Sequence, residues 1–221
     1  MAKDLENIMD GNNVFLSTEI NQASTNGVIV QLTKWVNALP IIKPSENSGW
    51  KIYTPYETIP NDIPVLNIWI NCCGGKTNLR HSLSTLLNIA SARGTIVKTY
   101  NLRQASSSAS MIAISGTHGY RYMAQNAFNY IHFGNKSSEV SHQDEIEYAT
   151  RDLKNFGQES LDLYLNRTKL TRKELNKYFT TEGSGYLTAE QCLDKGLCDW
   201  VITNDGRFVN SVLELKNQNQ K

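Results

Sequence analysis

The sequence predicts an α/β fold in which βαβ units stack around a largely parallel sheet. The first observation is a set of three apolar, β-rich runs: VLNIWIN at 65–71, TIVKTYNL at 95–102 and FNYIHF at 128–133. The second is an apolar stripe at helical spacing between the first two runs, formed by Leu79, Leu83, Leu86, Leu87 and Ala90. Strands that alternate with helices through short links are typical of stacked βαβ units.

Two further elements precede the first of these runs. NVFLSTEI at 13–20 is an expected strand, and GVIVQLTKWVNAL at 27–39 is an expected helix. All five prolines then fall between Pro40 and Pro64. Because proline interrupts helices and central strands, this stretch is interpreted as a long connection or an insertion.

The elements after Pro64 follow in regular order. The helix with the leucine stripe is expected to end at Gly94, and a short helix is expected to begin in the serine-rich stretch and run to Gly116. A long helix is expected at 142–166, with one stripe made of Ile146, Ala149, Leu153, Phe156, Ser160 and Leu163.

Two capping boxes mark later helices. Thr171 with Glu174 begins TRKELNKYF, and Thr188 with Gln191 begins TAEQCLDKG. The last residues, LKNQNQK, are expected to fray.

Composition excludes several classes of partner and site. The chain has 221 residues and a net charge of +1, so no nucleic-acid or membrane partner is predicted. No run is long and apolar enough for a transmembrane helix, and the N-terminus lacks a signal peptide. The four cysteines form no pair of C-x-x-C hooks, so neither a metal nor another cofactor is expected. A cytoplasmic location is the simplest interpretation.

The stretch RQASSSAS at 103–110 raises the question of a nucleophilic serine. A serine at a strand-to-helix turn is exposed, and the unpaired N–H groups of the first helical turn can hold an oxyanion. Ser107 fits this position, with the N–H of Ser108 as donor. Ser110 fits poorly, because one turn further the next N–H is already bonded within the helix. The alternative is that these serines only cap a helix.

Two other features follow strands of the same predicted sheet. INCCGG at 70–75 ends in paired glycines, which can present bare backbone N–H groups at the mouth of a parallel sheet. His132 ends the run NYIHF. Each feature alone has a structural explanation, but glycines, serine and histidine at successive strand ends favour one functional site.

These motifs resemble the proteolytic subunit of the Clp protease. The family strand ending I-N-S-P-G-G is similar to Ile70–Gly75, and G-Q-A-A-S-M-G-A is similar to Arg103–Ser110, which puts the family's nucleophile on Ser107. Aligning the family serine with Ser110 instead would need a three-residue gap before Gly116, Gly119 and Arg121. M-I-H falls on 130–132, and the late F-L-S-A motif on 186–189. The resemblance covers most of residues 4–202, and the Asn-rich, divergent sequence would suit a phage-encoded member.

The resemblance implies a fold of the Clp protease/crotonase type, built from ββα and βαβ units with a protruding helical handle. It places a single domain at 1–202 with the Pro-containing insertion at about 40–64, followed by a partly frayed C-terminal extension at 203–221. It implies a serine endopeptidase with Ser107 as nucleophile, His132 as general base, and the N–H groups of Gly75 and Ser108 as oxyanion hole.

The resemblance also implies partners. Family members form heptameric rings that stack in pairs through the long helix, and they work with an ATP-driven unfoldase or with a second Clp-like subunit. Peptides or unfolded proteins would be the substrates, cleaved inside the chamber.

The chain departs from the family in several places. Ser184 stands at the usual position of the triad aspartate, and Glu182 is a nearby carboxylate that could replace it. Phe133 and Gly134 follow the histidine where the family has Q-P. The segment MAKDLENIMDGNN is long enough for the family's first helix but not for its N-terminal hairpin.

Other functions stay open. A catalytically weak or inactive ring subunit, with a structural or regulatory role, is favoured by the missing aspartate. A serine–lysine peptidase would need Lys76 as base. An acyl-CoA enzyme of the crotonase type would share the βαβ stacking.

Overall fold

In a computed structural model, the chain forms one nine-stranded sheet flanked by helices. The structure describes residues 6–40, 51–132, 143–179 and 185–218, with the side chains at 143–153 and 156 left aside. The described strands are β1 Ile8–Asp10, β2 Asn13–Leu16, β3 Val65–Cys72, β4 Ile96–Ser106, β5 Arg121–Ala124, β6 Phe128–Tyr130, β7 Tyr186–Thr188, β8 Trp200–Ile202 and β9 Phe208–Val209.

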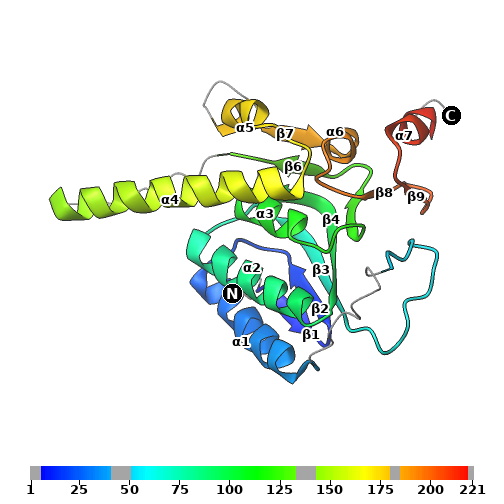
Figure 1. Cartoon of the computed structure of the whole chain (residues 1–221), viewed down its shortest axis with the longest axis horizontal. Helices are drawn as coiled ribbons and strands as arrows, with labels where there is room; N and C mark the ends of the chain where they lie inside the picture. Colours follow the sequence, from blue (N-terminus) through cyan, green and yellow to red (C-terminus); the bar gives the residue numbers. More distant parts are fainter. Residues whose placement is uncertain (1–5, 41–50, 133–142, 180–184, 219–221) are drawn as a thin grey trace, which may run out of the picture.

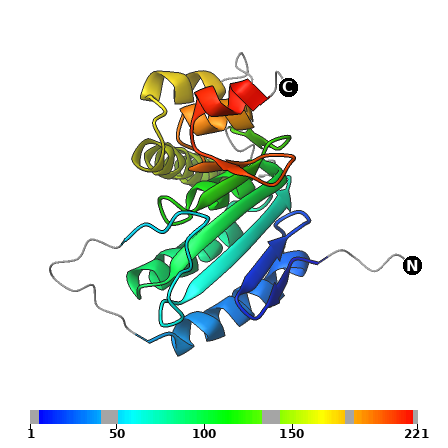
Figure 2. The same ribbon diagram turned by 90° about the vertical axis from the view of Figure 1, so that its right-hand side faces the viewer.

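The sheet is parallel at its centre and antiparallel at its margins. Its main path runs β1-β2-β3-β4-β5-β8-β9, while β6 pairs with the far end of β4 and with β7. The pairs β2–β3, β3–β4, β4–β5, β4–β6 and β5–β8 are parallel; β1–β2, β6–β7 and β8–β9 are antiparallel. The predicted α/β class with a largely parallel sheet is therefore confirmed, and the strands lie side by side in Figure 2.

The helices are arranged around this sheet in Figure 1. Their bounds are α1 Gln22–Ala38, α2 Thr77–Ala92, α3 Ser108–Ile114, α4 Gln143–Arg167, α5 Arg172–Phe179, α6 Ala189–Asp194 and α7 Val212–Gln218. α1, α2 and α3 cover one face of the central strands, whereas α4 extends away from the body as a handle. The described residues include no helix long and apolar enough to span a membrane.

Local sequence signals explain several helix ends. α1 begins earlier than the predicted residue 27, because Asn21 and Ser24 form a capping box that the prediction overlooked: the Asn21 side chain accepts from the Ser24 N–H at 2.9 Å. The capping box of α6, formed by Thr188 and Gln191, is confirmed. Glu174 and Thr171 bond reciprocally at the start of α5, as the sequence predicted.

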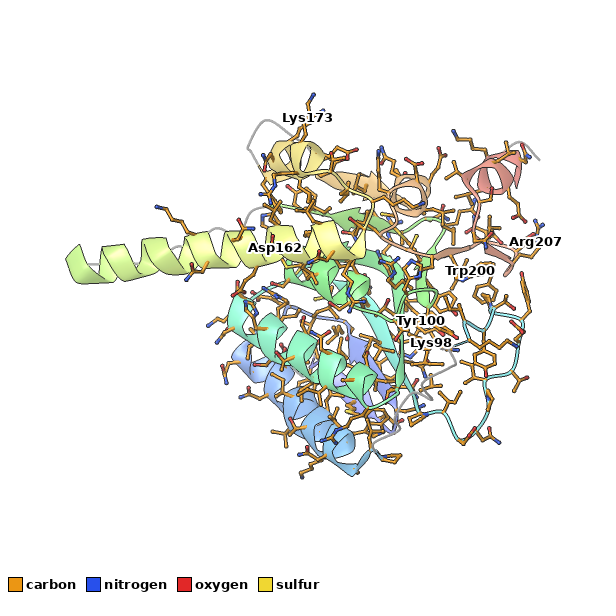
Figure 3. All side chains as sticks on the ribbon, viewed as in Figure 1. Lys98, Tyr100, Asp162, Lys173, Trp200 and Arg207 are labelled. Atoms are coloured by element: carbon orange, nitrogen blue, oxygen red, sulfur yellow. The ribbon has the colours of Figure 1, made fainter. Side chains whose placement is uncertain are left out.

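The faces of the sheet are apolar in different ways. Alternate residues of β3 are buried among aliphatic residues of α1 and α2; these are Leu66, Ile68, Ile70 and Cys72. The opposite face carries stacked aromatic rings on successive strands: Phe15, Trp69, Tyr100 and Tyr122, with centroids 6.4, 4.1 and 4.8 Å apart. Figure 3 shows the labelled Tyr100 and Trp200 on this face, which part of the segment 51–64 covers.

Two expectations need correction. The N-terminal segment does not form a helix over its described residues: Ile8–Asp10 is the strand β1, which turns at Gly11 (φ +57°) and pairs with β2. β4 extends four residues beyond the predicted end at 102, while the short helix begins within the serine-rich stretch, at Ser108, as predicted. Pairing with β6 outweighs the weak strand propensity of Gln104 and Ser106. Of the Pro-containing segment, residues 41–50 lie outside the described residues.

Candidate active site

The carboxyl ends of three parallel strands bring the predicted site residues to one edge of the sheet. Cys72 of β3 pairs with Ala105 of β4, and Ser106 of β4 pairs with Tyr130 of β6. The glycines at 74–75, Ser107 and His132 each follow within three residues of these pairs. Ligands of open α/β sheets bind at such a carboxyl edge.

Ser107 occupies a strained turn between β4 and α3. Its backbone has φ +55° and ψ −123°, and it is the sole non-glycine residue with positive φ in the described part of the chain. A side chain in such a region costs about 1–3 kcal/mol and persists only where the surroundings enforce it. Such turns expose a nucleophilic serine at the top of a sheet. The half-buried Ser107 therefore has the backbone of a nucleophile.

Hydrogen bonds on both sides hold this turn. The Ser107 N–H donates to the Tyr130 carbonyl oxygen at 2.8 Å, and the Ser107 carbonyl accepts from the Ser110 N–H at 3.0 Å. The first bond ties the turn to β6, and the second closes the first turn of α3.

Gly74 presses directly against the serine. A Cβ atom at Gly74 would lie 2.7 Å from the Ser107 Cβ and 2.5 Å from the Ser106 carbonyl oxygen. Gly74 also has φ +99°, which other residues rarely adopt. A glycine is therefore required here for the chain after β3 to approach Ser107.

The two predicted oxyanion donors are joined by a side chain. Ser108 Oγ donates to the Gly75 carbonyl oxygen at 2.8 Å, which fixes the two residues beside each other. Within the described residues, neither the Gly75 N–H nor the Ser108 N–H donates a hydrogen bond. Ile20 clamps the glycine turn, because its N–H donates to Gly74 O and its carbonyl accepts from Lys76 N, both at 2.7 Å. Two free N–H groups are thus held close to Ser107.

His132 lies two residues beyond Tyr130 and is half-buried. Its ring stacks on the Tyr130 ring, with centroids 5.3 Å apart and planes at 29°. Across the described residues, no hydrogen bond joins Ser107 Oγ to the His132 ring. Catalytic hydrogen bonds are often long before substrate binds.

Ser110 has a different environment from Ser107. It is fully buried, and its hydroxyl shares a 2.6 Å hydrogen bond with the hydroxyl of Tyr164 in α4. Ser110 therefore joins α3 to α4 and is inaccessible to a substrate.

Two further side chains near the glycines, those of Cys72 and Lys76, have different environments. Burial raises the pKa of Cys72 to about 11, so this thiol, which contacts the Thr18 carbonyl oxygen at 2.9 Å, stays protonated at neutral pH. Lys76 is exposed at the start of α2. In the described parts of the chain, no group of three or more His, Cys, Asp or Glu residues could hold a metal ion.

Ser184 and Glu182 lie outside the described residues. The neighbouring Gly185 is described, and its carbonyl accepts from the Ile131 N–H at 2.9 Å. A Cβ at Gly185 would lie 1.6 Å from the Ile131 carbonyl oxygen, so the chain packs tightly against the residue before His132.

Sequence reasoning missed Gly74 and Tyr130 as parts of the site. The sequence indicates Gly74 only as one of a pair of potential donors, because its contact with Ser107 depends on the register of β3 and β4. Tyr130 could have been found, because side chains two residues apart on a strand share a face.

The chain matches the model of a known protein family. The model of the family described as Clp protease matches residues 59–205, which is more than half of the chain and includes Gly75, Ser107, Ser108 and His132.

Proposed function

Because this chain belongs to the Clp protease family, we propose that it is a serine peptidase that cleaves peptides or unfolded proteins. Ser107 is the nucleophile, His132 the general base, and the N–H groups of Gly75 and Ser108 the oxyanion hole. The observation that carries the proposal is the backbone of Ser107, which is strained, half-buried and enclosed by Gly74 and Tyr130.

The reaction follows from these roles. His132 takes the proton from Ser107 Oγ as the oxygen attacks the peptide carbonyl, and the Gly75 and Ser108 N–H groups hold the oxyanion. His132 then gives the proton to the leaving amine, which breaks the C–N bond and leaves an acyl ester on Ser107. His132 then takes a proton from water as the water oxygen attacks the ester; the acyl C–Oγ bond breaks, the proton returns to Ser107 Oγ, and the acid product leaves.

The substrate and the assembly belong to the same proposal. An extended peptide would add beside the glycine segment through main-chain hydrogen bonds, which gives modest sequence preference. The protein would act as a cytoplasmic heptameric ring or a stacked pair of rings, together with an unfoldase or a second Clp-like subunit. Ser184 would stand where the family has its triad aspartate, and a triad without its carboxylate turns over more slowly, by up to about 10⁴-fold.

The proposal is tested by labelling the folded protein with a fluorophosphonate and mapping the modified peptide. We expect the label on Ser107, its loss in Ser107→Ala, and a large decrease in His132→Ala. Ser110→Ala should still be labelled, because Ser110 is buried against Tyr164. A label on Ser110 would move the nucleophile by three residues.

A second candidate is a catalytically weak or inactive ring subunit with a structural or regulatory role. It is favoured by Ser184 and by the lack of a Ser107–His132 hydrogen bond among the described residues. Absence of label on a folded, assembled protein would favour this candidate over the peptidase.

A further inference from the structure

In the part of the chain that the structure describes, the His132 ring has one interacting side chain, Tyr130. No described carboxylate, lysine or arginine forms a hydrogen bond or an ion pair with this ring. In a serine triad, a carboxylate normally holds the imidazole in its productive orientation. A chain with Ser184 at that position needs another means to orient the base.

The stack follows from the strand. β6 ends at Tyr130, and residues 130 and 132 point to the same side of the extended chain. Centroids 5.3 Å apart with planes at 29° are within the range of offset aromatic stacking. Since a ring face attracts a cation, the same contact stabilises the imidazolium that forms when His132 takes a proton.

Tyr130 is fixed to the nucleophile as well. Its carbonyl oxygen accepts the Ser107 N–H at 2.8 Å, and the next residue, Ile131, donates its N–H to Gly185 O at 2.9 Å. Tyr130 also pairs with Tyr186 across the β6–β7 ladder. The residue that stacks on the base is therefore held in the sheet on both sides.

We propose that Tyr130 is a positioning residue that restricts rotation of the His132 ring and faces the imidazolium during proton transfer. The proton moves from Ser107 Oγ to His132 and on to the leaving amine, and Tyr130 exchanges no proton. This inference rests on the proposed peptidase function.

The test compares three variants by their rate of inactivation with a fluorophosphonate, separated into kinact and KI. Tyr130→Phe keeps an aromatic face, and Tyr130→Leu removes it. Because Tyr130 is 37% exposed, we expect both variants to fold. Tyr186→Leu is the matched control, because Tyr186 lies opposite Tyr130 and its ring stacks on Phe128 at 4.8 Å.

We expect Tyr130→Leu to lower kinact by about two- to fivefold with KI unchanged, the factor that a cation–π contact at a partly exposed site supplies. Tyr130→Phe should restore the wild-type kinact, and Tyr186→Leu should leave it unchanged. The inference is overturned if Tyr130→Leu has the wild-type kinact, if Tyr130→Phe has a kinact as low as that of Tyr130→Leu, or if Tyr186→Leu lowers kinact as much as Tyr130→Leu does.

NMR of the His132 ring protons separates this inference from the proposed function. Stacking should shift these protons upfield in wild type and Tyr130→Phe, but not in Tyr130→Leu. If wild type takes no label yet shows the shift, the peptidase proposal fails and the stack stands. If wild type is labelled but shows no shift, the peptidase stands and Tyr130 has no positioning role.

Discussion

At the scale of single residues, Gly74→Ala tests whether the close approach of the chain after β3 holds Ser107, the proposed nucleophile, in place. The new Cβ would clash with Ser106 O and the Ser107 Cβ, at 2.5 and 2.7 Å, and φ +99° would add strain. We expect a stability loss of about 1–3 kcal/mol and a loss of fluorophosphonate labelling at Ser107. Urea unfolding and labelling at the same temperature measure the two effects.

Gly27→Ala is the control for this change. Gly27 lies inside α1, and a Cβ there would meet no heavy atom within 4 Å. Alanine should stabilise the helix by about 0.5–1 kcal/mol and leave labelling unchanged. Normal labelling of folded Gly74→Ala would show that the contact with Gly74 does not position Ser107.

The sequence favours Ser107 over Ser110 as the candidate nucleophile for a geometric reason. An N–H in the first turn of a helix is free, while one a turn later is bonded, and this distinguishes Ser107 from Ser110 in the sequence alone. The sequence could not reveal that Ser107 has positive φ, because its surroundings come from elsewhere in the chain: Gly74 follows β3 and Tyr130 ends β6. It also could not reveal Tyr164 as the buried partner of Ser110.

At the scale of elements, Glu174 links α5 to α6 and should make their contact sensitive to acid. Hydrogen bonds from Lys195 and then from Thr171 lower the pKa of Glu174 to about 2. Because the folded pKa is below the usual 4.5, this contribution is fully present above pH 4.5 and is lost as the pH falls towards 2.

Glu174→Gln keeps an acceptor for the cap of α5 but removes the ion pair. We expect a loss of less than about 1 kcal/mol at pH 7, since both side chains remain about one third exposed (30% and 34%) and solvent screens the pair. The decline in stability between pH 4.5 and pH 2 should also become shallower. Glu190→Gln, which breaks a 3.1 Å ion pair with Lys216, is the control. Its loss of stability between pH 4.5 and pH 2 should be closer to that of wild type than the loss in Glu174→Gln. If the free energy of unfolding falls equally between pH 4.5 and pH 2 in wild type and Glu174→Gln, the expectation is contradicted.

Helices and strands with a clear apolar pattern or capping motif could be predicted from the sequence. Short strands that form only by hydrogen bonding to a neighbouring strand could not. The apolar run of β3 and the capping boxes of α5 and α6 are visible in the sequence. β1, β7 and β9 have two or three residues each and exist because a neighbouring strand offers its hydrogen bonds. The last four residues of β4 likewise depend on β3 and β6.

At the scale of the whole molecule, two hydrophobic cores support the edge of the sheet at which the candidate site residues lie. One aliphatic core lies between α1, α2 and the first strands, and a second lies under α4 to α7. α3 begins at the site and has residues in both cores, among them Ile112 and Ile114. Ser107 therefore stands at the start of a helix that is completely buried, which gives the strained turn a rigid support.

The handle α4 is the element from which assembly can be predicted. It has 25 residues, which gives about 37 Å at 1.5 Å per residue, and it extends from the body in Figure 1. Phe156, whose side chain lies outside the described set, continues the stripe of Leu153, Ser160 and Leu163 in the sequence. If rings stack through this helix, wild type should sediment as a double ring.

Phe156→Glu should then halve the sedimenting mass, because a carboxylate cannot be buried in an apolar contact without a partner. Lys154→Glu is the matched control: Lys154 is exposed, and two residues along a helix turn it by about 200° to the other face. It should leave the double ring intact. Equal dissociation of both variants would indicate a general charge effect, and a wild type that sediments as a single chain would contradict the proposed assembly. Loss of Ser107 labelling together with the halved mass would show that ring stacking orders the site from a distance.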